Sequence, residues 1–325
     1  MKKFVKYFLR FLVLLIVAAV VFFFWASSPT LDENKYEVLI SNEDIKVQEN
    51  DSIFSIVTYN IGYLSGMTNN RAVPKPKELF KTNLQKVLVE TKKVNADIIA
   101  FQEIDYDASR SYNINQQNEI AKLGFNYIAG AVNWDETYVP FPYWPPSMHF
   151  GKVVSGQSII SKYPLKEHKR IVLERVAGAP FYRDALYLER LAQVVKVTLN
   201  GQDVILINVH LEAFDKQTRV NQFNEVLALF NTYKTEYPTI LLGDFNSRAR
   251  NEEAIIQKMF AMSAIGNAAF NIENPANTFD TKKPFERIDY IFYTKNSIEY
   301  ISGKVLTEFG QASDHLPVEM SFKLK

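Results

Sequence analysis

Residues 239–246 read TILLGDFN and join an apolar run to two polar side chains. The run 239–242 has the composition of a short buried strand, and Asp244 and Asn246 follow directly after Gly243. A turn alone would explain this ending, because Asp and Asn are common turn formers. Ligand sites in layered sheets, however, also collect at the ends of strands.

The same arrangement recurs elsewhere in the chain, where an apolar strand meets a polar side chain. These junctions are Asn60 after SIVTY, Glu103 after DIIAFQ, His210 after VILINV, Asp289 before YIFY, and Asp314-His315 before the last strand. Any one of these residues alone could have a purely structural role. The occurrence of the whole set in one domain indicates that they share a site. Carboxylates gathered in one place repel each other unless a cation neutralises them. The sequence therefore predicts a metal held by oxygen ligands.

The chain has no cysteine, which excludes disulfides, thiol nucleophiles, iron–sulfur clusters and cysteine-based zinc sites. The remaining ligand types favour Mg²⁺, with Mn²⁺ or Ca²⁺ as alternatives. Of the four histidines, His210 and His315 lie at strand ends. We expect His168 to be a solvated turn residue and treat His149 as a candidate substrate contact.

Charge is unevenly distributed along the 325 residues. The chain has 37 basic and 36 acidic residues, and four of the basic ones (Lys2, Lys3, Lys6 and Arg10) lie within the first ten. The rest of the chain is slightly acidic, so no strongly basic body built for nucleic acid is indicated. Three cations remain candidates for contacts to a substrate phosphate: Lys152, Arg183 and Arg190.

Residues 11–26 read FLVLLIVAAVVFFFWA and carry no charge. Residues 5–26 are long enough to cross a bilayer if Lys6 and Arg10 reach back to the interface. The basic flank predicts a single-pass anchor with a cytoplasmic N-terminus and an extracytoplasmic body at the cell membrane. The alternative is a signal peptide, cleaved near Ala26, that releases a secreted protein.

After a polar segment at 29–52, read as a linker or a first strand, strands and helices alternate. We predict strands at 54–59, 97–102, 194–199, 204–211, 239–242, 288–293 and 317–322, and helices at 79–94, 113–123, 220–230 and 252–262. Asn200-Gly201 marks a hairpin. Hairpins mixed with helical crossovers predict an α+β layered sandwich.

Residues 138–150 read YVPFPYWPPSMHF and contain four prolines. This composition excludes a helix or a central strand and predicts a loop. Two interpretations stay open. The loop either folds onto its own aromatic rings and the rim of the core, or forms a wall of the substrate site or a lobe that faces the membrane.

The ordered motifs TYNIG, FQEID, NVHL, GDFN, RIDY and SDH, with GQSIISKYP between the second and third, resemble the endonuclease/exonuclease/phosphatase superfamily over residues 53–322. That group includes DNase I-like nucleases, bacterial sphingomyelinases and inositol polyphosphate phosphatases. The resemblance implies a four-layer αββα sandwich, with 53–325 as the catalytic domain. It also implies metal-dependent phosphoester hydrolysis. Residues 1–28, by their composition, add a cytoplasmic basic tip and a transmembrane anchor before this domain.

The resemblance assigns roles by position. Glu103 corresponds to the main metal carboxylate, with Asn60 assisting and Asp314 as a second acidic ligand. Asp289 corresponds to the partner of His315. Asp244 and Asn246 correspond to the pair that positions water and phosphate, and His210 to the histidine that binds the phosphate.

These features lead to three hypotheses about function. The first is a membrane-anchored phosphodiesterase or nuclease. The second is an enzyme acting on a phospholipid headgroup or an inositol phosphate, which a membrane tether favours through a high effective concentration. The third is an inactive binding scaffold, against which the intact motif set argues. We expect contact with the bilayer through residues 5–26 and no obligate protein partner.

Overall fold

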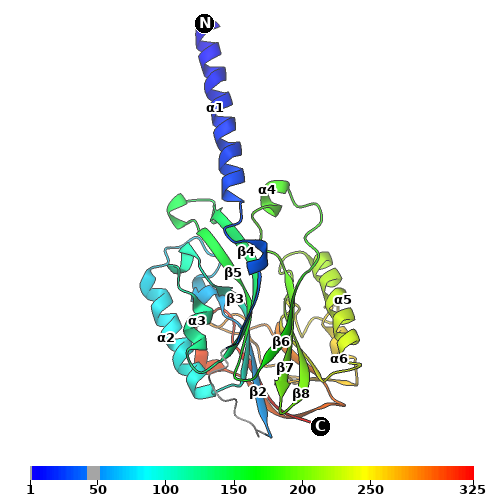
Figure 1. The fold of residues 1–325 in the computed structure, drawn as a ribbon. Coiled ribbons are helices and arrows are strands. Elements are labelled where there is room, and N and C mark those ends of the chain that lie inside the picture. The colour runs from blue at the N-terminus through cyan, green and yellow to red at the C-terminus, as the bar shows by residue number, and fades with distance from the viewer. Residues whose placement is uncertain (1, 42–51) are drawn as a thin grey trace.

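The computed structural model describes residues 2–41 and 52–325, and within them two β-sheets pack face to face (Figure 1). The larger sheet has the order β1 (Glu37–Ser41), β4 (Tyr127–Val139), β5 (Gly151–Ser161), β3 (Ile98–Asp105), β2 (Phe54–Asn60), β13 (Val318–Leu324) and β12 (Ile298–Val305). The smaller has the order β10 (Ile265–Asn267), β11 (Asp289–Thr294), β9 (Thr239–Asp244), β8 (Gln202–His210), β7 (Leu191–Leu199) and β6 (Leu165–Val172).

Helices cover the outer faces of both sheets. α2 (Lys77–Val94) and α3 (Gln116–Ala121) lie on the larger sheet, and α5 (Lys216–Tyr233) and α6 (Gln257–Phe260) lie on the smaller one (Figure 1). Both sheets are mixed, because β2 pairs parallel with β3 and β8 parallel with β9 whereas the other pairs are antiparallel. The predicted α+β sandwich with two sheets inside and helices outside is therefore confirmed.

Alternation along single strands explains the layers. In β3, Ile98 and Ala100 belong to the core between the sheets, whereas Ile99 and Phe101 pack in the core under α2. A strand buried on both faces reads as a continuous apolar run, as DIIAF does. Sequence periodicity was less reliable for helices. The helix predicted at 252–262 is wrong in extent, because only four residues of it, Gln257–Phe260, are helical.

Side-chain amides join the two sheets inside the sandwich. The Nε2 of Gln102 on β3 donates to the Oδ1 of Asn208 on β8 at 2.6 Å, and the Nδ2 of Asn208 donates to the carbonyl of Phe101 and to Gln193. Gln193 also lies 3.1 Å from the Nε2 of His168. The prediction that His168 is a solvated turn residue is therefore wrong. It is buried on β6, where apolar surroundings lower its pKa.

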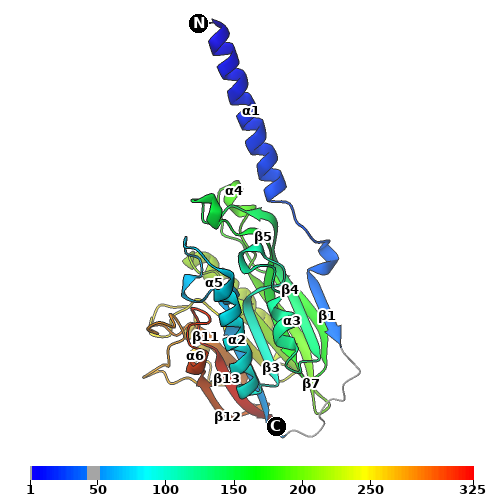
Figure 2. The ribbon, with the colours of Figure 1, turned by 90° about the vertical axis from the view of Figure 1, so that its left-hand side faces the viewer.

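α1 (Lys2–Ala26) projects away from the body (Figures 1 and 2). Its 25 residues span about 37 Å and are apolar enough to cross a membrane, and the apolar window is not buried against the rest of the chain. A helix of this kind near the N-terminus fits a membrane anchor or a signal sequence. Of the predicted 29–52 segment, residues 37–41 form the edge strand β1, and 42–51 lie outside the described residues.

Candidate active site

Strand register brings three of the predicted site residues into one row at the end of the smaller sheet. His210 on β8 pairs with Asp244 on β9, and Asp244 pairs with Asp289 on β11. Gly243 allows β9 to lie close to the parallel strand β8, because a Cβ added at this position would lie 2.0 Å from the carbonyl oxygen of Val209. Its φ of +138° also favours glycine. The short strand that TILLGD forms therefore carries its carboxylate to the centre of the row.

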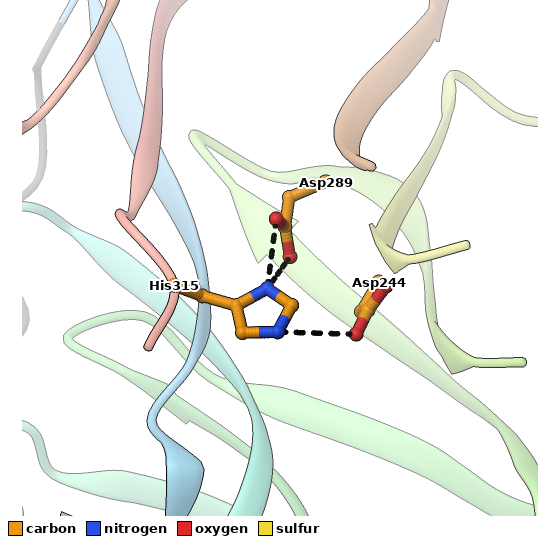
Figure 3. A group of neighbouring side chains, drawn as sticks. All are labelled: Asp244, Asp289 and His315. Atoms are coloured by element: carbon orange, nitrogen blue, oxygen red, sulfur yellow. Dashed lines mark hydrogen bonds and ion pairs between the residues drawn. The ribbon is translucent and has the colours of Figure 1, made fainter. Parts of the chain in front are cut away.

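His315 reaches this row from the other sheet, just before β13. Its Nδ1 lies 3.0 Å from Asp289 Oδ2, and its Nε2 lies 3.8 Å from Asp244 Oδ2 (Figure 3). Burial alone would lower the pKa of His315, but the Asp289 and Asp244 carboxylates raise it well above its ordinary value. His315 is therefore an imidazolium near neutral pH when the carboxylates beside it are ionised.

Asp244 is fully buried between several donors. It accepts a 3.0 Å hydrogen bond from Asn60 Nδ2 and a 2.9 Å bond from the backbone N–H of Asn246. Burial and the charge of Asp289 raise its pKa to about 7. The side chain of Asn246 turns the other way and donates to the carbonyl of Leu211. Asn246 thus stabilises the turn after Asp244 with its side chain and bonds to the Asp244 carboxylate through its backbone.

A second acidic pair lies beside the row. Glu103 sits at the irregularity in the β3–β5 pairing with a φ of +51°, so its side chain leaves the regular alternation of the strand. Asn69 Nδ2 donates to Glu103 Oε2 at 2.8 Å and lies 3.4 Å from both carboxylate oxygens of Asp314. Burial and the charge of Asp314 raise the pKa of Glu103.

His210 is paired with a cation. Arg190 Nη1 donates to the Nε2 of His210 at 2.6 Å, while Glu212 and Tyr187 hold the guanidinium from behind at 3.3 and 3.2 Å. Because Nε2 accepts this bond, the imidazole proton resides on Nδ1, which is buried and has no hydrogen-bond partner among the described residues. Burial and the charge of Arg190 hold the pKa of His210 well below its usual range.

The donor set fits a hard divalent cation at either of two places. Asp244, Asp289 and His315 each offer one ligand atom, and these atoms lie within 4.8 Å of one another. There, however, the imidazolium already supplies positive charge. Glu103 and Asp314 face each other across a single neutral amide and receive no cationic hydrogen bond from the described residues. The pair at Glu103 therefore has the greater need of a metal.

Most of these groups line a cleft with a volume of about 1320 Å³. Glu103, Asp314, Asn246 and Arg183 line it together with His210, Asp244 and His315, whereas Asp289, which bonds to His315, is not part of the lining. Arg190 also lines the cleft. The sequence analysis proposed it as a contact to the substrate phosphate, and in the structure it donates a hydrogen bond to His210.

Two predicted substrate contacts fall outside the lining of this cleft. His149 accepts or donates at 2.8 Å to the hydroxyl of Tyr138, and Lys152 forms a 2.6 Å ion pair with Asp107. Both are thus engaged within the protein. Asn60 is buried beside Asp244: its Nδ2 donates to the Asp244 carboxylate, and its Oδ1 accepts from the backbone N–H of Gly62.

Sequence reasoning missed two polar residues of the site. Asn69 joins Glu103 to Asp314, and the Thr278 hydroxyl donates to Asp289 Oδ2 at 2.5 Å. Neither follows an apolar strand, because both stand in irregular segments. The spacing of polar residues after strands, the signal that found the others, therefore could not identify them.

The fold and this constellation define a class of two-sheet α+β proteins with an acidic, histidine-containing cleft. The family model described as the endonuclease/exonuclease/phosphatase family matches residues 57–315. The chain belongs to this family, whose members are metal-dependent phosphoesterases.

Individual relatives are distant. YbhP of Escherichia coli (strain K12) is 22% identical over 272 residues, which cover 83% of this chain and 96% of YbhP. An endonuclease/exonuclease/phosphatase of Beutenbergia cavernae is 20% identical with a TM-score of 0.62, covering 84% of this chain and 72% of the other. The catalytic domain of human Nocturnin is 18% identical with a TM-score of 0.59, covering 89% and 98%. These similarities establish a DNase I-like fold.

Proposed function

We propose that this protein hydrolyses phosphoester bonds with the help of a divalent metal held by Glu103 and Asp314. The observation that carries the proposal is that His210, Asp244 and His315 line one cleft together with that carboxylate pair, with Asp289 bonded to His315. Asn60 would assist through its side-chain oxygen. Mg²⁺ is the expected ion, with Mn²⁺ or Ca²⁺ as alternatives, because the ligands are oxygen atoms.

The charge of each residue indicates its role in the proposed reaction. Asp244, with its pKa of about 7, is the proposed base that takes a proton from the attacking water. The His315 imidazolium and the Arg190 guanidinium then stabilise the charge that develops on the phosphoryl oxygens. Water adds to phosphorus, one ester P–O bond breaks, and the leaving oxygen takes up the proton that Asp244 accepted from the water. A bound metal would supply further stabilisation of the same oxygens.

Purified full-length protein in detergent micelles provides the test. We would assay bis(4-nitrophenyl) phosphate, 4-nitrophenyl phosphate and plasmid DNA with Mg²⁺, Mn²⁺, Ca²⁺ or EDTA. We expect metal-dependent turnover of at least one substrate, reduced at least about 10³-fold in His315→Ala. Lys122→Ala, an exposed residue after α3, is the matched control and should retain full activity. No turnover by a folded, metal-binding protein would favour the inactive scaffold instead.

The nuclease hypothesis rests on the family resemblance. The assay on plasmid DNA tests it, since a nuclease would nick the plasmid in the presence of metal and leave it intact with EDTA.

We further propose that α1 remains as a single-pass anchor with the body on the extracytoplasmic side of the cell membrane. Contacts between the end of α1 and the body support this proposal. Trp25 and Phe22 pack on Tyr138, and Ser28 bonds to Thr137. Intact mass of the membrane-extracted protein is the test. A mature form that begins near residue 27 would instead establish a cleaved signal and a secreted enzyme.

A further inference from the structure

The cleft has two chemically different ends. One end holds the carboxylates and histidines, whereas apolar and aromatic side chains line the other: Phe22 and Phe23 of α1, Phe141, Tyr143, Tyr182 and Phe214. The phosphate of a phosphoester would fill only the polar end. The cleft volume of about 1320 Å³ exceeds the range of roughly 300–1,000 Å³ that is usual for small-molecule sites. The shape and lining therefore fit a phosphoester attached to a large apolar group.

The apolar end lies where α1 joins the body. The carboxylate of Asp135 on β4 accepts hydrogen bonds from the backbone N–H groups of Thr30 and Leu31 at 2.9 and 2.8 Å, and from the Tyr36 hydroxyl at 3.0 Å. Ser28 and Thr137 exchange further bonds. These contacts fix the segment that follows α1 on the body, so the membrane end of the helix and the mouth of the cleft keep a defined relationship.

Rings from α1 pack on the same region. Phe23 meets Phe181 of α4 (Phe181–Asp184) with ring centroids 5.5 Å apart, and Trp25 stacks on Tyr138 at 5.8 Å. Both views of the fold place α4 and the loop between β4 and β5 at the base of α1 (Figures 1 and 2). The end of the body that carries these segments therefore faces the bilayer that α1 would cross.

Large aromatic side chains stand exposed at this end. We call five of them the aromatic rim: Tyr143 (71% exposed), Trp144 (78%), Phe181 (74%), Tyr182 (54%) and Phe214 (76%). Leaving such large side chains in water is unfavourable, and exposed apolar groups gathered at one end of a protein mark an interaction site. Tyr and Trp prefer the interface between the headgroups and the acyl chains of a membrane.

We propose that the aromatic rim sits in the interface of the bilayer that α1 spans, and that the substrate is a phospholipid of that same bilayer. The lipid enters at the apolar end of the cleft, and its phosphate reaches Asp244 and His315 while its acyl chains stay near the rim. Arg183, which lines the cleft next to the rim, offers a cation to the headgroup region. This inference rests on the proposed hydrolytic function and names its substrate class.

The depth of the rim can be measured without any activity. The chain has no native cysteine, so Trp144→Cys gives a unique site for an environment-sensitive fluorophore. Glu299→Cys on β12, which lies far from α1 in Figure 2, is the matched control. In phosphatidylcholine/phosphatidylglycerol vesicles with brominated acyl chains, we expect quenching at position 144 at least about threefold stronger than at 299. Equal quenching would overturn the placement of the rim.

Substrate choice is tested with lipids and their deacylated counterparts. Full-length protein in vesicles is offered phosphatidylcholine, phosphatidylethanolamine and phosphatidylglycerol, and separately the matching water-soluble glycerophosphodiesters. We expect kcat/KM for at least one lipid to exceed that of its deacylated counterpart by at least about tenfold. Trp144→Ser combined with Phe181→Ser, neither of which lines the cleft, should lower lipid turnover about tenfold and leave bis(4-nitrophenyl) phosphate turnover unchanged.

The control variant and the outcomes separate the two proposals. Ile301→Ser, an exposed apolar residue on β12, should change neither activity. Metal-dependent cleavage of bis(4-nitrophenyl) phosphate or DNA without any preference for lipid would overturn the phospholipid inference and leave the hydrolase standing. Absence of turnover on every soluble and lipid substrate would overturn both.

Discussion

Arg190 donates a 2.6 Å hydrogen bond from Nη1 to the Nε2 of His210, so the histidine of the NVHL motif presents a guanidinium to the cleft instead of its own proton. Glu212, which stands two residues after His210, pairs with the same guanidinium. Positive charge at this side of the cleft therefore belongs to Arg190, and His210 positions it while staying neutral.

The first prediction concerns this pair. In Arg190→Gln the pKa of His210 rises, because one of the causes that lower it is removed. We expect kcat to fall about 10²-fold, as for the loss of one stabilising donor in a closed site. Carbon and proton NMR on histidine-labelled protein, with only four histidines to assign, reads the pKa directly. Arg190→Lys is the matched variant, and an unaltered His210 titration in Arg190→Gln would contradict the assignment.

The second prediction concerns Asp289 and His315. Asp289→Asn removes the largest cause that raises the pKa of His315, so that pKa falls. We expect kcat to fall at least about 10³-fold while the thermal midpoint changes little. Thr278→Val, which removes only the hydroxyl bound to Asp289, should cost much less. Equal losses in the two variants would argue for a purely structural role of the carboxylate.

The third prediction distinguishes the two candidate metal positions. Glu103→Gln and Asp314→Asn should each weaken Mn²⁺ binding at least about tenfold in calorimetry or electron paramagnetic resonance. Asp289→Asn should leave binding nearly unchanged, because its carboxylate is neutralised by His315. The reverse pattern would place the ion among Asp244, Asp289 and His315.

The fourth prediction follows from the raised pKa of Asp244. Its carboxyl titrates near pH 7 in the folded protein and near pH 4 when unfolded, so folding favours the protonated form. Its contribution to stability is therefore present at low pH and lost as the pH rises from about 4 to 7. In EDTA, we expect the free energy of unfolding of the wild type to fall relative to that of Asp244→Asn between about pH 5 and pH 8.

Denaturant unfolding of both proteins across this range supplies the measurement. The difference between them reports Asp244 together with His315, whose pKa Asp244 helps to raise, and cancels the groups that do not contact Asp244. Mg²⁺ should raise the stability of the wild type more at pH 8 than at pH 5, because metal binding competes with protons. A constant difference between the variants would show that Asp244 is not perturbed.

The fifth prediction concerns the amides between the sheets. Asn208→Leu removes the acceptor of the 2.6 Å bond from Gln102 and leaves the Oε1 of Gln193 without its donor, although Gln102 keeps its bond to Thr58. Buried polar groups without hydrogen bonds cost about 1–3 kcal/mol each, so we expect a loss of about 2–4 kcal/mol in chemical unfolding. Asn224→Leu, on the exposed face of α5, is the control and should change stability by less than about 0.5 kcal/mol.

Much of the fold and the site could be predicted from the sequence alone, because strands that are buried on both faces consist of uninterrupted apolar residues. DIIAFQ, VILINV and TILLGD each form a central strand. Of the polar residues at their ends, His210 and Asp244 belong to the row on the smaller sheet, and Glu103 belongs to the acidic pair beside it. The apolar segment at the N-terminus likewise dictated a long helix, since nothing in it can break one.

Tertiary structure decided which of these residues meet and in what protonation state. Asp244 and His315 are 71 positions apart, and only the packing of two sheets places them 3.8 Å from each other. The same packing buries His168, assigns Arg190 to His210 and brings Asn69 between Glu103 and Asp314. Burial and neighbouring charge set pKa values, and both depend on distances through space that spacing along the chain does not encode.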